Sequence, residues 1–471
     1  MRDAAFAATM LGLLGLALVR PFVGVLLWSW ISFMNPHRLV WGVAGEQPWA
    51  MAVFLVTLLG CVLAGELRRP AWNAVTLLLL ALMLAFTATT VLALGNPAEA
   101  WAKWERAIKV LLGLLVTASM LTDRRRIQAL VWVMVLSIGY FGVRGGIFAL
   151  LTGGNYRVWG PDQTMIADNN HLAAAMLVTL PLMNFLRLQS AHAVVRAGLV
   201  VAMALTLLAT IASYSRGALL GLLAVTFVLW LRSTRKLASA LVLAAALAGA
   251  IAFMPSGWMD RMNTIGVPSQ DESASERLVL WGISLQLALD RPLVGAGFTG
   301  PYNRAVVDRV APGGPARAVH SIWFETLGEH GFPTFLLWVG LSVAGFASPS
   351  RLMRLGRDRP ALRWAEDLGR MGQVAIVAYL VSGSFLSLSY WDFYWTLLVV
   401  VAAAHGLAQR AVAPQHAAAR PGWRDKRWQH KERADGFALL PGHAGRDRLA
   451  GLVGRLPGPG GLVPLRDAGR Q

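Results

Sequence analysis

The stretch RAIKVLLGLLVTASMLTDRRRIQALVWVMVLSIGYFGVRGGIFALL, residues 106–151, places two long apolar runs on either side of three consecutive arginines. Each run approaches or exceeds the length of about 20 residues with which a helix crosses a bilayer. The arginines at 124–126 interrupt the runs, because a charged side chain is costly inside hydrocarbon. The stretch therefore predicts two membrane-spanning helices that are joined by a basic turn.

The rest of the chain repeats this pattern. Of its 471 residues, 56% are hydrophobic and only 14% are charged, which lies outside the range of soluble globular proteins. We therefore expect an all-α polytopic membrane protein with about twelve spans. The sequence leaves open whether the first span is one helix broken at Pro21 or two short helices. The expected spans are 4–34, 50–65, 72–94, 106–122, 127–151, 171–187, 195–213, 217–231, 237–254, 332–347, 371–389 and 391–408.

The net charge of +18 follows the loops between these spans. Basic residues gather in every second loop, and the positive-inside rule assigns those loops to the cytoplasm. Most of the charge is thus a topology signal, and nucleic acid is not an expected partner. We expect both chain ends in the cytoplasm, although the N-terminal side depends on how residues 4–34 cross the membrane.

This topology divides the chain into four parts. Residues 1–254 form the N-terminal spans, 255–331 a large external loop with short helices, and 332–408 the C-terminal spans. Residues 409–471 form a basic, Gly/Pro-rich tail that we expect to be disordered and cytoplasmic. A loop as long as 255–331 is usually functional in a compact protein.

Several common sites are excluded by their motifs. The stretch GAGFTG, 295–300, matches a dinucleotide-binding pattern but lacks the strand and helix around it, so we interpret it as a loop turn. The chain has no phosphate-binding G-K-[ST] motif, no Asp-x-Asp pair and no Cys/His cluster with zinc spacing. We therefore expect no metal and no other cofactor. The single cysteine, Cys61, cannot form an intrachain disulfide.

Two arginines lie next to apolar segments on the external side, and their positions need an explanation. Arg216 lies between two apolar runs in SYSRGALLG, 213–221, where burying a guanidinium costs at least about 2.5–3.5 kcal/mol and implies an anionic partner. The alternative is that Arg216 reaches the lipid headgroups. Arg277 lies in SERLVLWG, 275–282, where it either binds an anion or pairs with a nearby acidic residue on the surface.

A histidine opens the segment HSIWFETLGEHG, 320–331. An imidazole titrates near neutral pH, so His320 is suited to take a proton from a hydroxyl. The alternative is a structural histidine bonded to a carbonyl. If the segment is helical from its start, Glu325 faces a different side from His320, and we expect no His–Glu dyad.

The remaining candidates are polar residues that would line the same cavity. In DNNHLAAA, 168–175, Asp168 and either Asn169 or Asn170 are suited to cap the helix that follows, which is a sufficient explanation of these residues. His171 is a candidate for the cavity wall, and so is Glu325.

In their order and spacing, these elements resemble the O-antigen ligase and polymerase superfamily. That superfamily carries an S-R-G element between two helices, an R-x-x-x-W element in the external loop and a histidine-led segment before the next span. Here the three elements are Ser215 to Gly217, Arg277 to Trp281 and His320 to Gly331. The stretches WMDRMNTI, LALDRPLVGAGF, DNNHLA and LGEHGFPT further resemble O-glycosylation ligases associated with the exosortase A system. The resemblance covers residues 1–408, and the tail after 412 does not share it.

The resemblance implies a glycosyltransferase of the bacterial inner membrane whose active site faces the periplasm. Its donor would be a glycan linked to undecaprenyl pyrophosphate, and its acceptor a hydroxyl of a lipid A core or of a protein, in contact with membrane lipids. His320 matches the family base, while Arg216 and Arg277 would bind the pyrophosphate leaving group. One base and a good leaving group predict direct displacement with inversion, without a metal.

Two alternatives remain open from the sequence. A polymerase would extend the glycan on its own carrier with the same fold and the same residues. A non-enzymatic transporter would need charged residues near the middle of the membrane. Arg144 is the one mid-span candidate, and it lies near the outer end of its span.

Overall fold

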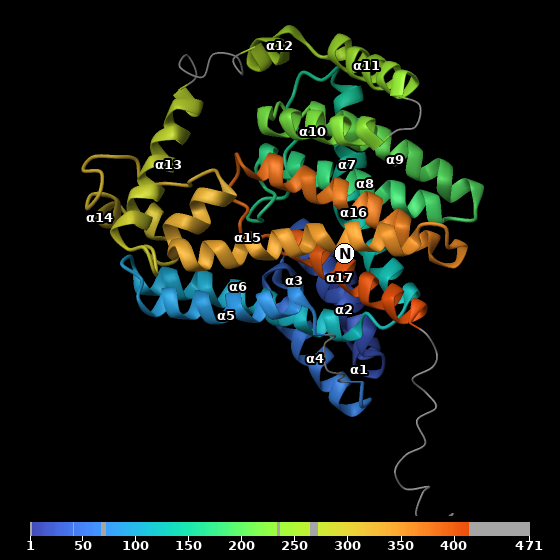
Figure 1. Cartoon of the computed structure of the whole chain (residues 1–471), viewed down its shortest axis with the longest axis horizontal. Coiled ribbons are helices and arrows are strands. Elements are labelled where there is room, and N and C mark those ends of the chain that lie inside the picture. Colours follow the sequence, from blue (N-terminus) through green and yellow to red (C-terminus); the bar gives the residue numbers. More distant parts are fainter. Residues whose placement is uncertain (1, 41, 67–71, 233–235, 264–271, 414–471) are drawn as a thin grey trace, which may run out of the picture. The chain divides into compact units, whose positions relative to one another are not determined.

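The computed structural model describes residues 2–413 except 41, 67–71, 233–235 and 264–271, and the described part is helical, with no strand (Figure 1). The expected all-α class is therefore confirmed. Among the described residues, 7 helices are long and apolar enough to cross a membrane, and three further apolar helices are shorter. The count of twelve spans stays a prediction. The expected disordered tail lies outside the described residues from 414 onward.

A helix or helix pair corresponds to each expected span. These elements are α1 (Arg2–Val19), α2 (Pro21–Met34), α4 (Trp49–Leu63), α5 (Ala74–Val91), α6 (Pro97–Met120), α7 (Arg124–Leu151), α8 (Asn169–Gln189), α9 (Ala193–Ile211), α10 (Arg216–Arg232), α11 (Lys236–Phe253), α15 (Ile322–Gly356), α16 (Arg363–Gly383) and α17 (Asp392–Val412). Short elements connect them, namely η1 (Pro36–Leu39), α3 (Val43–Glu46), α12 (Ser256–Asn263), α13 (Glu272–Asp290), η4 (Gly300–Tyr302), α14 (Arg304–Val307) and η5 (Pro360–Leu362).

The first expected span is two helices, because α1 ends at Val19 and Pro21 begins α2 with Arg20 as its N-cap. The chain then turns back, and α2 packs against α1 and α4. The Asp3 carboxylate accepts a hydrogen bond of 3.1 Å from the Ala44 amide, and Ser32 donates to Asp392 at the start of α17. Asp3 therefore lies at the end of the bundle where α17 begins. The expectation that both chain ends lie in the cytoplasm stays a prediction, because residues from 414 onward lie outside the described part of the chain.

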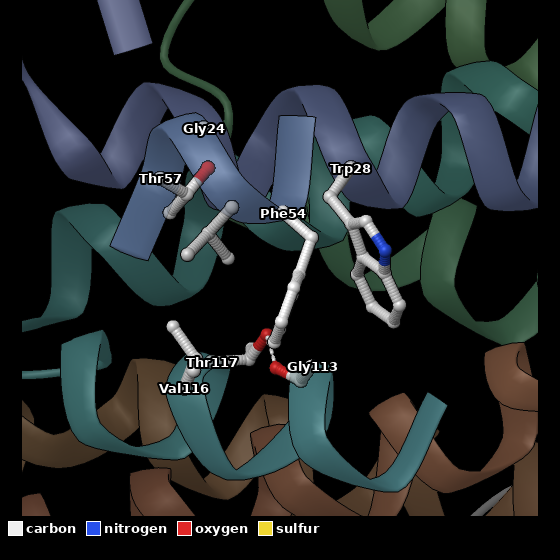
Figure 2. Close-up of a pocket in the computed structure, with 8 residues that line it drawn as sticks. Gly24, Trp28, Phe54, Thr57, Gly113, Val116 and Thr117 are labelled. Carbon is white, nitrogen blue, oxygen red and sulfur yellow. Dashed lines mark hydrogen bonds between the residues drawn. The ribbon is translucent and has the colours of Figure 1, made fainter. Parts of the chain in front are cut away.

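Small residues allow α2, α4 and α6 to approach closely. Figure 2 shows Gly24 of α2 facing Thr57 of α4, and Gly113 of α6 next to Trp28 of α2. The Thr117 hydroxyl donates a hydrogen bond of 2.8 Å to the Gly113 carbonyl (Figure 2), so this hydroxyl is satisfied within its own helix. This packing joins the N-terminal helices to the rest of the bundle.

The most buried helices are α8, α16 and α17. Helix α16 packs on both α8 and α15, which Figure 1 shows beside it. The rings of Tyr379 and Tyr394 stack at 3.6 Å between α16 and α17. By contrast, α1 and α9 expose most of their apolar surface, as helices in contact with lipid do. The ends of α8, α10 and α15 that begin these helices meet at one end of the bundle, which we call the site end.

Helix α15 is interrupted at Gly331, whose backbone has φ 71° and ψ −176°. The interruption frees carbonyls, and the stretch around GAGFTG satisfies them. Ala296 donates to the Gly328 carbonyl at 2.9 Å, Gly297 donates to the Glu329 carbonyl at 2.7 Å, and Phe332 donates back to Pro292 at 2.8 Å. The stretch is thus a structural turn that follows α13, without the strand that a dinucleotide site requires.

The close approach of this turn gives a testable prediction. Gly297 has φ +80°, and a Cβ there would lie 2.2 Å from the Ala93 Cβ, whereas Gly313 has φ +77° and no atom within 4 Å of a Cβ. Both Gly297→Ala and Gly313→Ala carry strain of roughly 1 kcal/mol from the positive φ. We expect Gly297→Ala alone to add a steric clash. Its melting temperature in detergent should fall clearly below that of Gly313→Ala, and equal values would contradict the packing described here.

Candidate functional site

Charged residues from four segments far apart in the sequence act on one another at the site end. Burial lowers the pKa of Arg277, and Arg261 lowers it further while Asp168 acts in the opposite direction. Burial likewise lowers the pKa of Arg261, with further contributions from Arg157 and Arg216. We call Arg157, Arg216, Arg261 and Arg277 the arginine cluster. Four guanidinium groups at one place repel one another, so the site is built to attract an anion.

The start of α8 supports this cluster. Asp168 caps the helix, as expected, by accepting hydrogen bonds from the Asn170 amide at 2.8 Å and the His171 amide at 3.3 Å. Its carboxylate also lies 3.2 Å from His171 Nδ1. Burial raises the pKa of Asp168, but these hydrogen bonds outweigh it and hold the pKa below its ordinary value. The Asn169 side chain is buried and donates to the Ser213 carbonyl at 2.6 Å, which ties α8 to the turn before Arg216.

The S-R-G element forms a tight turn between α9 and α10. Tyr214 has φ 60°, an uncommon conformation for a residue other than glycine, and its hydroxyl donates to the Gly154 carbonyl at 2.9 Å. The Tyr214 carbonyl in turn accepts a hydrogen bond of 2.9 Å from Arg261 Nε of α12. Arg216 is the first residue of α10, at the site end. The turn therefore positions Arg216 and holds Arg261 next to it.

The R-x-x-x-W element has a geometric explanation. Residues four apart lie on one face of a helix, so Arg277 and Trp281 project from the same side of α13. The Trp281 indole donates to the Val319 carbonyl at 3.1 Å and stacks on Phe324, with the ring centroids 5.3 Å apart. The tryptophan thus attaches α13 to the segment of His320. Among the described residues, the buried Nε of Arg277 has no hydrogen-bond partner. The acidic residues before it that we considered as surface partners, Asp271 and Glu272, have side chains outside the described part.

His320 precedes α15 instead of lying in it. Its φ of 53° is in the left-handed region, and its amide donates to the Ser387 hydroxyl at 2.9 Å. Strained residues of this kind are typical of functional sites. Burial, then the charges of Arg277 and His171, lower the pKa of His320 to about 4. The imidazole is therefore neutral at neutral pH and able to accept a proton.

Glu325 lies beneath the site and not in its lining. Lys103 of α6 is 3.3 Å from Glu325 and 2.8 Å from Glu329, which are both buried. The Tyr302 hydroxyl donates to Glu325 at 2.8 Å, and the Tyr390 hydroxyl donates to Glu329 at 2.6 Å. We call these five residues the Lys103 network. It fixes the first turns of α15, which begin two residues after His320.

Sequence reasoning missed three contributors to the site, namely two arginines and one connection between helices. Arg157 and Arg261 complete the arginine cluster. Arg261 lies in the stretch WMDRMNTI, which the sequence linked only to a family resemblance. The connection between α16 and α17, residues 384–391, was also missed. Its Ser387 holds His320, and its Ser384 accepts a hydrogen bond of 2.8 Å from the Trp323 indole. The only sequence signal was a short serine-rich stretch between two spans.

Within the described part of the chain, no group of three His, Cys, Asp or Glu residues could hold a metal ion. The described functional groups around the arginine cluster include guanidinium donors, the Asp168 carboxylate and the neutral imidazole of His320. This set is able to bind a multiply charged anion and to accept a proton beside it.

Comparisons with known proteins match two ranges of the chain. Residues 201–339 match a family described as O-antigen ligase. The matched range contains Arg216, Arg277 and His320, together with the α12 residue Arg261. Residues 1–191 match a family of unknown function, DUF5935. A search of curated proteins finds no match.

The depressed pKa of His320 gives the second prediction, which needs no substrate. A neutral imidazole reacts with diethyl pyrocarbonate and a protonated one does not, so His320 should stay reactive down to about pH 5. Arg277→Gln removes a cation that lowers this pKa, and the midpoint of reactivity should move to higher pH. Peptide mass spectrometry of the modified protein measures the midpoint. Arg309→Gln removes an exposed charge as a control and should leave it unchanged, whereas equal midpoints in all three proteins would contradict the assigned cause.

Proposed function

We propose that the chain, whose residues 201–339 match a family described as O-antigen ligase, is a glycosyltransferase that uses a polyprenyl pyrophosphate-linked glycan. The donor would be a glycan on undecaprenyl pyrophosphate, and the acceptor a hydroxyl at the periplasmic face of the bacterial inner membrane. The observation that carries this proposal is the arginine cluster next to a neutral histidine, at one end of a helical membrane bundle.

The arginine cluster suits the leaving group. When the glycosidic bond breaks, its electron pair and negative charge go to the pyrophosphate oxygen. Guanidinium groups stabilise that charge with paired hydrogen bonds and do not lose their own proton. In this proposal Arg216 and Arg277 bind the pyrophosphate, and the unpartnered Nε of Arg277 is one donor available for it. Arg261 and Arg157 add to the positive field.

His320 suits the acceptor. The acceptor oxygen forms a bond to the anomeric carbon while its proton moves to the neutral imidazole of His320. The attack comes from the face opposite the leaving group, so the configuration at that carbon inverts. The Ser387 hydroxyl and the Lys103 network hold the backbone on both sides of the histidine. Asp168, Asn169 and His171 then form the neighbouring wall, and no metal is needed in this chemistry.

The acceptor distinguishes two related activities. A ligase transfers the glycan to a lipid A core or to a protein hydroxyl, as the exosortase-associated ligases that the sequence resembles would do. A polymerase transfers it to a second carrier-linked glycan with the same residues. We propose the ligase, because residues 201–339 match the family described by that activity. Incubation of the reconstituted protein with the donor alone, and then with lipid or protein acceptors, separates the two.

The third prediction concerns His320 as the base. Gln keeps much of the size and hydrogen bonding of His but cannot accept a proton at neutral pH. We expect His320→Gln to lower the transfer rate by about 10²–10⁴-fold while donor binding is retained. Transfer is measured by mass spectrometry of products in proteoliposomes, with the amount of folded protein determined alongside. A rate near that of the unmodified protein would exclude His320 as the base.

The fourth prediction concerns the guanidinium groups. Arg216→Lys and Arg277→Lys keep the charge but lose the paired hydrogen bonds, so both should raise the KM for the donor and lower kcat. Arg309→Lys is the matched control, because Arg309 is exposed and lies outside the cluster. Unchanged kinetics in both cluster variants would leave only a general electrostatic role and remove the specific proposal.

A further inference from the structure

Arg144 is a charge in a membrane helix that the proposed reaction does not use. It lies on α7, seven residues before the helix ends at Leu151, and its side chain is exposed. Among the described residues it has no ion pair. A charged side chain at this depth is expensive unless it meets an anion or water. Its surroundings show which of these it would meet.

Two cavities meet at Arg144. One has a volume of about 770 Å³ and lies between the start of α1, residues 37–46 and the α7–α8 loop. The other has a volume of about 580 Å³ and lies between α7, α8 and α9. Both are lined by Tyr140 and Arg144, so they adjoin at these two side chains, and we call them the joined cavities. Both volumes are in the range of small-molecule sites.

The first cavity is polar and positively charged. Its charged lining residues are Arg2, Arg38, Arg144, Glu46 and Asp162, which together carry a net charge of 3 − 2 = +1. The described residues include no ion pair between these arginines and carboxylates. Arg38 instead donates to the Gln163 side chain at 2.8 Å. This lining offers guanidinium donors to a phosphate and carboxylate acceptors to hydroxyl groups.

The second cavity is apolar, apart from the two shared residues. It follows α7 from Val135 to Ile147, and Leu199 and Ala202 of α9 line its other side. Twelve residues of helix extend about 18 Å. This depth is close to one leaflet, which is about half of the 30 Å hydrocarbon core. The cavity therefore has the depth and the chemistry for a lipid chain whose headgroup lies at the site end.

We propose that the joined cavities bind an anionic glycerophospholipid of the phosphatidylglycerol type, with its phosphate at Arg2, Arg38 and Arg144 and an acyl chain between α7 and α9. Its single negative charge neutralises the net charge of the polar cavity, and its headgroup hydroxyls donate to Glu46 and Asp162. Basic pockets between membrane helices are a known setting for anionic headgroups. Zwitterionic phosphatidylcholine lacks both the net charge and the hydroxyl donors. This inference does not depend on the proposed glycosyltransferase activity.

The test is binding of phosphatidylglycerol to the delipidated full chain in detergent, followed by native mass spectrometry. We expect one phosphatidylglycerol molecule to bind tightly and phosphatidylcholine to bind much more weakly. Arg144→Gln should weaken binding of phosphatidylglycerol roughly tenfold, the loss expected for one charge-assisted hydrogen bond. The matched control is Arg125→Gln, which removes an exposed arginine from the opposite end of the same helix and should change nothing.

A second pair of variants tests the apolar cavity. Ala202→Trp fills it without changing the charge and should also displace the lipid, whereas Ala204→Trp, at an exposed position of α9 outside the lining, should not. The proposal is overturned if Arg144→Gln and Arg125→Gln bind phosphatidylglycerol equally. It is also overturned if phosphatidylcholine binds to the unmodified protein as tightly as phosphatidylglycerol. Displacement of phosphatidylglycerol by one equivalent of a polyprenyl phosphate would show that the cavity belongs to the carrier lipid instead.

Discussion

The ammonium group of Lys103 lies between two carboxylates that are shielded from water, Glu325 and Glu329. Charges in such a place are tolerated only when they are paired and their remaining hydrogen bonds are made. Tyr302 and Tyr390 make those bonds, one to each carboxylate. The first turns of α15 can therefore pack only where α6 supplies the lysine. His320 lies two residues before these turns, so the pairing fixes the chain on one side of it while Ser387 holds its amide.

The interruption of α15 at Gly331 separates the turns that this ion pairing fixes from the rest of the helix. The turns before it belong to the charged network, and the turns after it form an ordinary apolar helix against α5 and α16. The turn at 295–297 replaces the backbone hydrogen bonds that the interruption removes. One helix thus joins a rigid polar platform to a membrane span. The break lies at a glycine with positive φ, a conformation that residues with a side chain rarely adopt.

The apolar runs could be located from the sequence because a bilayer requires length and apolar composition, which are local properties. Arg216, Arg277 and His320 were also accessible, since each borders an apolar run and stands out there. What the sequence did not show depends on contacts between distant segments. Lys103 and Glu325 are 222 residues apart, so the burial of Glu325 had no local signal. The same applies to Arg261 and to the serine-rich connection that holds His320.

The position of Cys61 has a practical consequence for spectroscopy. It is the only cysteine of the chain, it has no exposed surface, and its sulfur lies 3.8 Å from the Met120 sulfur between α4 and α6. Reagents in the aqueous phase therefore cannot reach a native thiol in the folded protein. A spin label or fluorophore can be attached to a cysteine introduced on any exposed loop while the native sequence is otherwise kept. Pairs of such labels would report distances across the site end during a reaction cycle without a cysteine-free background.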